Sequence, residues 1–246
     1  MGFVTRASFL FFLLLSGSSN AQQNMVTARV EIRRKPVANP ERKANATNDF
    51  SEVVVWLEPV EHWGEAVVSA QPSQKRPQLV QKNKSFQPHL LVVPLGSVVD
   101  FPNRDPFFHN VFSLFDGKRF DLGLYESGAT NSVRFDRVGV SYLFCNIHPE
   151  MSAVVVAIDT PYFGVSDRSG KVSITNVPDG KYRLHVWYER GLPDEMKSLA
   201  KTISVSPTTT DAGTISVPEN PSFSPTHKNK YGQDYAPPPA APYSHP

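Results

Sequence analysis

The sequence predicts an all-β protein, because its apolar residues recur with the two-residue period of strands and turn-forming residues interrupt it often. Twenty-two of the 246 residues are proline, which is disfavoured inside helices and central strands and so marks frequent breaks. No long stretch shows the 3.6-residue period of an amphipathic helix, and only residues 191–200 favour a short one. The length allows one large or two small domains with a buried core.

Residues 1–21 have the layout of a secretory signal peptide. Arg6 precedes an apolar run from Phe9 to Leu15, and small residues then lead to Ala21. The run is shorter than the ~20 apolar residues that a membrane-spanning helix needs. We therefore expect cleavage near Ala21 and a periplasmic or secreted protein with no membrane span.

Several segments of the first two thirds of the chain predict strands. Residues 26–34 alternate apolar and charged side chains, which indicates a strand with one buried face. Residues 52–58 form the next strand, which Pro59 ends. Further short strands are expected at 79–81, 90–94, 98–101, 111–115, 132–135, 140–145 and 153–158.

Charge and cysteine content exclude some classes of protein. Without Arg6 the chain has 24 basic and 23 acidic side chains, and this balance gives no reason to expect nucleic-acid binding. Cys145 is the single cysteine, so no intramolecular disulfide can form. In an oxidising compartment an unpaired thiol should be bound to a metal or reactive.

The loop 145–151, with sequence Cys-Asn-Ile-His-Pro-Glu-Met, is the candidate metal site. It joins two apolar runs, and the period of the first run places Cys145 at the end of a strand. Thiolate and thioether are soft donors and imidazole is borderline, so Cys145, His148 and Met151 favour copper over magnesium or calcium. Zinc fits less well, because a structural zinc site normally closes with four cysteine or histidine ligands.

A blue-copper centre takes two histidines, a cysteine and a weak axial methionine, so one histidine must come from outside the loop. His109 is our candidate, because it follows a predicted strand end and turn at residues 100–106. His89 qualifies by residue type alone, and a structural hydrogen bond is the preferred interpretation for it. A lone cysteine or methionine would be an ordinary core residue, so the prediction depends on the combination of four suitable donors.

The pattern His109-Asn110 followed by Cys145-x-x-His148-Pro149-x-Met151 resembles the cupredoxins, the type 1 copper proteins. It is most similar to the amicyanin and plastocyanin group, and the short spacings within the loop are those of amicyanins. The resemblance covers about residues 78–159 and implies a Greek-key β-sandwich. It also implies that His109, Cys145, His148 and Met151 bind copper, that Asn110 hydrogen-bonds the ligand loop, and that electrons pass through His148 to a redox protein partner.

Residues 162–187 show a different pattern, three strands with turns at 167–170 and 178–180. Their Asp-x-x-Gly and Val-Pro-x-Gly-x-Tyr-x-Leu segments resemble the carboxypeptidase regulatory-like or transthyretin-like β-sandwich, and a generic pair of hairpins is the alternative. Such a sandwich begins with two further strands, which residues 26–34 and 52–58 could supply. We therefore predict a smaller sandwich split between 22–75 and 160–217, with a copper domain at 76–159 inserted into it.

From Pro218 onward eight of 29 residues are proline, so residues 218–246 are expected to be a disordered tail. The leading functional prediction is an exported copper protein that carries single electrons. The alternative is a non-redox binding or copper-scavenging protein that uses the second sandwich to dock a partner or a glycan. We do not expect an enzyme, because multicopper catalysis would need clusters of further histidines and the seven in this chain are dispersed.

Overall fold

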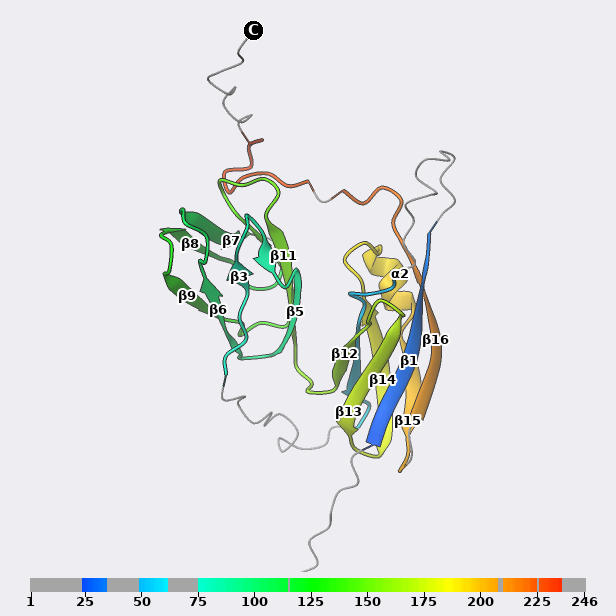
Figure 1. Cartoon of the computed structure of the whole chain (residues 1–246). Helices are drawn as coiled ribbons and strands as arrows, with labels where there is room; N and C mark the ends of the chain where they lie inside the picture. Colours follow the sequence, from blue (N-terminus) through cyan, green and yellow to red (C-terminus); the bar gives the residue numbers. More distant parts are fainter. Residues whose placement is uncertain are drawn as a thin grey trace, which may run out of the picture.

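The computed structural model describes residues 24–34, 49–61, 75–114, 116–207, 210–224 and 226–235. Within these ranges the chain is nearly all β, as predicted, and two β-sandwiches lie side by side in Figure 1. Helix α2 (Pro193–Ser198) lies inside the predicted helical segment. The predicted signal peptide lies outside the described residues. None of the described helices has the length and apolar character needed to cross a membrane.

The first sandwich, called here the split sandwich, takes strands from both ends of the described chain. In one sheet β1 (Asn24–Arg33) lies between β13 (Lys171–Val177) and β16 (Thr210–Pro218). β1 is antiparallel to β13 and parallel to β16. The N-terminal strand is therefore an inner strand, hydrogen-bonded on both edges.

The facing sheet of the split sandwich also has an N-terminal strand in its interior. β2 (Val54–Pro59) pairs with β12 (Phe163–Val165) on one edge and β14 (Gly180–Trp187) on the other, and β15 (Lys201–Val205) follows β14. Each of the two N-terminal strands is therefore an inner strand of one of the two sheets.

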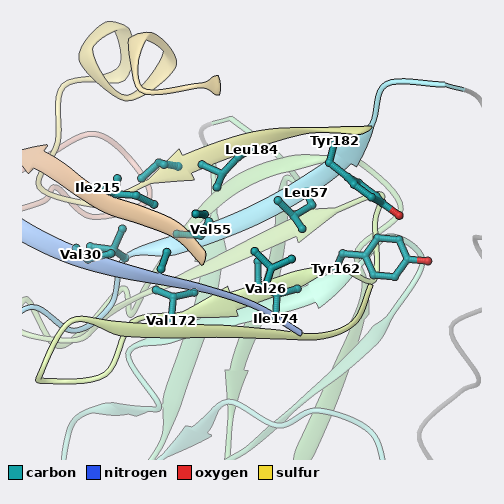
Figure 2. Packing of buried hydrophobic residues seen from close by; sticks show 14 of the residues in the cluster. Val26, Val30, Val55, Leu57, Tyr162, Val172, Ile174, Tyr182, Leu184 and Ile215 are labelled. Atoms are coloured by element: carbon teal, nitrogen blue, oxygen red, sulfur yellow. The ribbon is translucent and has the colours of Figure 1, made fainter. Parts of the chain in front are cut away.

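Alternating side chains of the two sheets form the core of the split sandwich. Along β1 the residues alternate between buried and exposed for most of its length, as the sequence pattern requires of a strand with one solvated face. Figure 2 shows Val30 and Val172 of one sheet facing Val55 and Leu184 of the other. The aromatic pair Tyr162 and Tyr182 packs edge to face at one end, with ring centroids 5.8 Å apart.

The second sandwich, called here the central sandwich, is formed by residues 79–158. Its larger sheet has the order β5-β11-β10-β7-β8, and two small sheets pair β3 with β4 and β6 with β9. The strand bounds are β3 Val80–Gln81, β4 Phe86–Gln87, β5 Leu90–Pro94, β6 Val98–Pro102, β7 His109–Ser113, β8 Phe120–Tyr125, β9 Thr130–Arg134, β10 Gly139–Phe144 and β11 Ser152–Ile158.

Strand β8 was not predicted from the sequence. Asp121 and Gly123 interrupt its apolar pattern, and both residue types are disfavoured in strands. The pairing with β7 shifts register between Asn110 and Phe112, and Gly123 has a left-handed φ of 66°. The irregularity is therefore a bulge that needs glycine.

β11 is buried on both faces, which explains its continuous apolar run. One face lies in the core of the central sandwich. From the other face, Val154, Val156 and Ile158 pack with Val54, Trp56 and Trp187 of the split sandwich. The two sandwiches are thus joined by an apolar interface.

At the edge of this interface, His89 forms an ion pair with Glu189 of the split sandwich, with 2.7 Å between Nε2 and Oε2. Its Nδ1 lies 3.1 Å from the carbonyl oxygen of Ser152. His89 is thus held by structural hydrogen bonds, as preferred from the sequence. The hydrogen bond with Glu189 raises the pKa of His89 above its ordinary value of 6.5, against the opposing effect of burial.

A group whose pKa is raised on folding stabilises the folded state at pH values below its ordinary pKa. This stabilisation is lost as the pH rises through the raised pKa. We therefore expect the melting temperature of the full chain to fall as the pH rises above 6.5, and Glu189→Gln to reduce that fall. Differential scanning calorimetry between about pH 5.5 and 8.5 measures both. Glu58→Gln is the matched control, since it removes a histidine ion pair with His185 that lies within the split sandwich. Equal pH profiles for wild type and Glu189→Gln would contradict the assignment.

Candidate metal centre

Neighbouring antiparallel strands bring the candidate ligands together. β7 begins at His109, β10 ends immediately before Cys145, and the two strands pair through Phe112 and Phe144. The start of one strand therefore lies beside the end of the other. Ligand atoms of His109, Cys145 and His148 all lie within 4.8 Å of one another, so the structure brings together three of the four predicted ligands.

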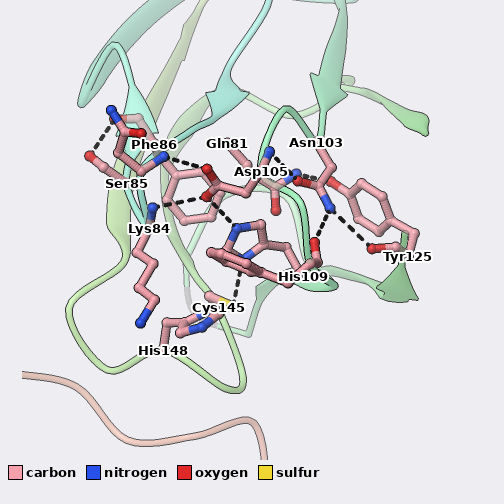
Figure 3. Close-up of polar contacts among 12 residues, drawn as sticks. Gln81, Lys84, Ser85, Phe86, Asn103, Asp105, His109, Tyr125, Cys145 and His148 are labelled. Atoms are coloured by element: carbon pink, nitrogen blue, oxygen red, sulfur yellow. Dashed lines mark hydrogen bonds and ion pairs between the residues drawn. The ribbon is translucent and has the colours of Figure 1, made fainter. Parts of the chain in front are cut away.

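The loop 145–151 is closed by two of its own backbone hydrogen bonds. The Cys145 N–H donates to the Met151 carbonyl (3.2 Å), and the Met151 N–H donates to the His148 carbonyl (3.1 Å). The loop therefore turns back on itself directly after β10. The turn brings the ring of His148 and the thiol of Cys145 close to the ring of His109 on β7, as Figure 3 shows.

The distances among these donors suit a shared metal ion. The sulfur of Cys145 is 3.8 Å from Nδ1 of His109 and 3.6 Å from Nδ1 of His148. Two donors that bind one tetrahedral ion at about 2.0 Å (nitrogen) and 2.3 Å (sulfur) lie roughly 3.5 Å apart. The residues therefore fit a metal bound by two imidazoles and a thiolate.

A buried carboxylate fixes the orientation of His109. Its Nε2 lies 2.8 Å from Oδ2 of Asp105, and both side chains are almost fully buried. A carboxylate can only accept, so Nε2 carries the proton and Nδ1 keeps its lone pair. Because Nδ1 is the atom nearest to the Cys145 sulfur, Asp105 holds the ring of His109 with this lone pair directed at the candidate metal centre.

Asp105 is itself held by backbone donors. It accepts hydrogen bonds from the N–H of Asn83 (2.6 Å) and of Lys84 (2.9 Å) in the turn between β3 and β4. Burial alone would raise the pKa of Asp105, but the hydrogen bonds from Lys84 and His109 outweigh it and the pKa is lowered. The carboxylate is therefore ionised at neutral pH. The sequence predicted only a turn at Asp105 and did not identify it as the partner of His109. The one indication in the sequence was its position four residues before His109.

Replacing Asp105 by asparagine removes the charge that orients His109. We expect Asp105→Asn to weaken copper binding by about 10- to 100-fold, as loss of a partner behind a metal-binding histidine typically does. Competition with a chelator measures the dissociation constant. Asp136→Asn is the matched control, because Asp136 is exposed and pairs only with Lys118 among the contacts of the described chain. Unchanged affinity in Asp105→Asn would show that the carboxylate does not orient the ligand.

The two histidines differ in exposure. His109 is fully buried, whereas His148 is half-buried and follows the exposed Ile147. Phe107 packs against both rings, with centroids 5.1 and 5.6 Å away. Burial and then the neighbouring His109 ring lower the pKa of His148, which favours the neutral imidazole that can bind a metal.

The two other predicted site residues, Met151 and Asn110, are not among the three clustered donors. Met151 is fully buried in the same apolar cluster as Cys145.

The resemblance implied that Asn110 bonds the ligand loop, but its side-chain amide instead donates to Asp121 (2.7 Å) and to the Gly123 carbonyl (2.9 Å). The unpredicted bulge of β8 explains the difference, since it leaves these acceptors beside Asn110.

The C-terminal tail also differs from its prediction. Residues 226–235 contact the ligand loop, where Tyr235 donates to the Cys145 carbonyl and the backbone of Lys230 to the Asn146 side chain. The disorder predicted from Pro218 onward therefore does not hold for this segment. The sequence did not predict this contact, because the segment is held by a few specific hydrogen bonds, and these leave no periodic apolar pattern.

Three solved structures illustrate what the chain resembles. A purple cupredoxin from Nitrosopumilus maritimus is 23% identical with a TM-score of 0.31, over 33% of this chain and 99% of that one. The reduced cuprous form of an amicyanin point mutant is 20% identical with a TM-score of 0.33, over 37% and 90%. A copper-containing nitrite reductase from Thermus scotoductus is 20% identical with a TM-score of 0.33, over 52% and 28%. No protein-family model and no curated protein matches the chain.

Proposed function

We propose that this protein is an exported type 1 copper protein that carries single electrons between redox partners. The observation that supports this most is the convergence of two imidazoles and a thiolate at one point. A soft thiolate with two imidazoles is the donor set of blue-copper electron-transfer sites. Met151, buried beside Cys145 in the same cluster, is the proposed weak axial ligand.

His109, Cys145, His148 and Met151 would hold the copper, and the bound ion would supply a one-electron couple between its cuprous and cupric states. The chain itself would keep the donors in place. Asp105 fixes the ring of His109, and the backbone bonds of the loop fix Cys145 relative to Met151. Donors that are already positioned need little rearrangement when the charge of the site changes, which suits rapid electron transfer.

His148 is the proposed route for electrons, because it is the more exposed of the two histidines. The exposed Phe108 and Ile147 lie next to the two histidines in sequence. A redox protein with an apolar contact surface would therefore meet the edge of His148. The proposal is a carrier because a thiolate with two imidazoles is the donor set of electron-transfer copper sites.

Copper titration of the purified metal-free protein tests the proposal. We expect one copper per chain, an intense visible absorption band and a cupric paramagnetic-resonance signal with narrow hyperfine splitting. Cyclic voltammetry should then give a reversible one-electron wave. Copper bound with weak absorption and no reversible wave would favour the copper-scavenging alternative. No binding at all would contradict both.

A further inference from the structure

The segment 226–235, called here the strap, crosses from one sandwich to the other. Figure 1 shows the orange to red part of the chain leaving β16 and running to the end of the central sandwich where the ligand loop lies. In Figure 3 the same segment passes outside the loop that carries Cys145 and His148. The strap therefore lies against the ligand loop, away from the sheets that precede it in sequence.

Tyr235 attaches the strap to the first ligand residue of the loop, and His227 attaches it to the residue before. The Tyr235 hydroxyl donates to the carbonyl of Cys145 (2.6 Å). Nδ1 of His227 lies 3.2 Å from the Tyr235 oxygen and 3.2 Å from the Lys228 carbonyl, so Nδ1 is the protonated atom. The His227 ring stacks on Phe144, with centroids 4.1 Å apart.

Lys230 attaches the strap at two further points. Its backbone N–H donates to Oδ1 of Asn146 (3.0 Å), and its ammonium group pairs with Oδ2 of Asp121 (2.7 Å). Oδ1 of Asp121 accepts from Asn110, the residue after His109. The strap thus bonds to the ligand loop and to the strand that lies beside His109.

The strap provides hydrogen bonds to loop residues that lie beyond the end of the β10–β11 pairing. The pairing of β10 with β11 ends at Phe144 and Ser152, so the polar groups of Cys145 and Asn146 lie beyond it. Buried backbone carbonyls need a hydrogen-bond partner. Tyr235 provides one for the Cys145 carbonyl, at a residue whose side chain is fully buried.

We propose that the strap is a positioning element that holds the ligand loop closed over Cys145, and that Tyr235 is its main positioning residue. The inference rests on the proposed function for the identity of the metal. The contacts of the strap are made between groups of the chain itself. The closure can therefore be tested whether or not the protein binds copper.

The thiol of Cys145 reports directly on closure, because it is the only cysteine and is fully buried. The probe is the reaction of the metal-free full chain with dithionitrobenzoate. We expect Tyr235→Phe to speed this reaction about three- to tenfold, since it deletes one hydrogen bond and keeps the ring. Truncation after Ser224 should speed it further, and a synthetic peptide of residues 225–246 should restore slow reaction.

Tyr231→Phe is the matched control. It makes the same chemical change in the same segment, but Tyr231 is 69% exposed and its ring faces Lys230. This variant should react at the wild-type rate. Equal rates for Tyr235→Phe, the truncated chain and wild type would overturn the inference.

A second measurement uses the copper-loaded protein. Truncation after Ser224 should speed removal of copper by a chelator at least as much as it speeds the thiol reaction, and should shift the position of the visible band. A change in thermal stability alone, with thiol reaction, band and copper release all unchanged, would mean that the strap is merely structural. If no variant binds copper, the proposed function fails and the thiol reaction still decides whether the strap closes the loop.

Discussion

Replacing Cys145 by serine is expected to abolish the intense visible absorption of the copper-loaded protein completely. The band of a blue-copper site requires a thiolate bound to copper, and a serine hydroxyl stays protonated at neutral pH. The serine hydroxyl would also occupy a fully buried position, at a cost of about 1–3 kcal/mol of stability if its hydrogen bonds are poor. Absorption and paramagnetic-resonance spectra measure the first effect, and chemical denaturation measures the second.

Met151→Leu provides the contrast within the same loop. Its thioether is the proposed weak ligand, so the variant should keep copper and colour while its reduction potential rises. Leucine conserves the volume of the buried methionine, so the packing should change little. A coloured Cys145→Ser protein would disprove thiolate ligation, whereas loss of all copper in Met151→Leu would make the methionine a primary ligand.

The sequence was sufficient to select candidate donors because donor chemistry depends on residue type. The single cysteine, the loop spacing and the strand period were enough to select Cys145, His148 and His109, and the structure places their ligand atoms within 4.8 Å of one another. The continuous apolar run at 153–158 also predicted β11 and its burial, because such a run needs cover on both faces. The apolar contact with the split sandwich supplies that cover.

The residues that support the site were harder to predict, because their roles depend on tertiary contacts. Asp105 has the composition of a turn residue and becomes the partner of His109 only through the fold around the turn at Asn83 and Lys84. The bulge of β8 has no apolar pattern, and it redirected Asn110. The strap has the composition of a disordered tail and is fixed by a few polar bonds.

The second large effect is expected from fragments of the chain. We propose that residues 76–159 form a copper domain inserted into the split sandwich. Residues 160–218 alone should then remain unfolded, because they lack β1 and β2, which are inner strands of the two sheets. Without them β13 would lose its partner β1, and β12 would lose β2. Circular dichroism measures the strand content of the fragment, and thermal unfolding shows whether it has a cooperative transition.

Residues 76–159 expressed alone should fold, since their core cluster draws its buried residues from 79–157. The fragment would expose Val154, Val156 and Ile158, which the split sandwich normally covers, so it should associate at high concentration.

Val156→Thr in the fragment should reduce that association and leave the fold intact, because Val156 faces away from the metal centre and threonine suits a strand. The full chain with Val156→Thr is the control, in which the same change should cost stability at the buried interface. A fragment that folds only when residues 24–61 are added would place β1 and β2 in the copper domain and contradict the insertion.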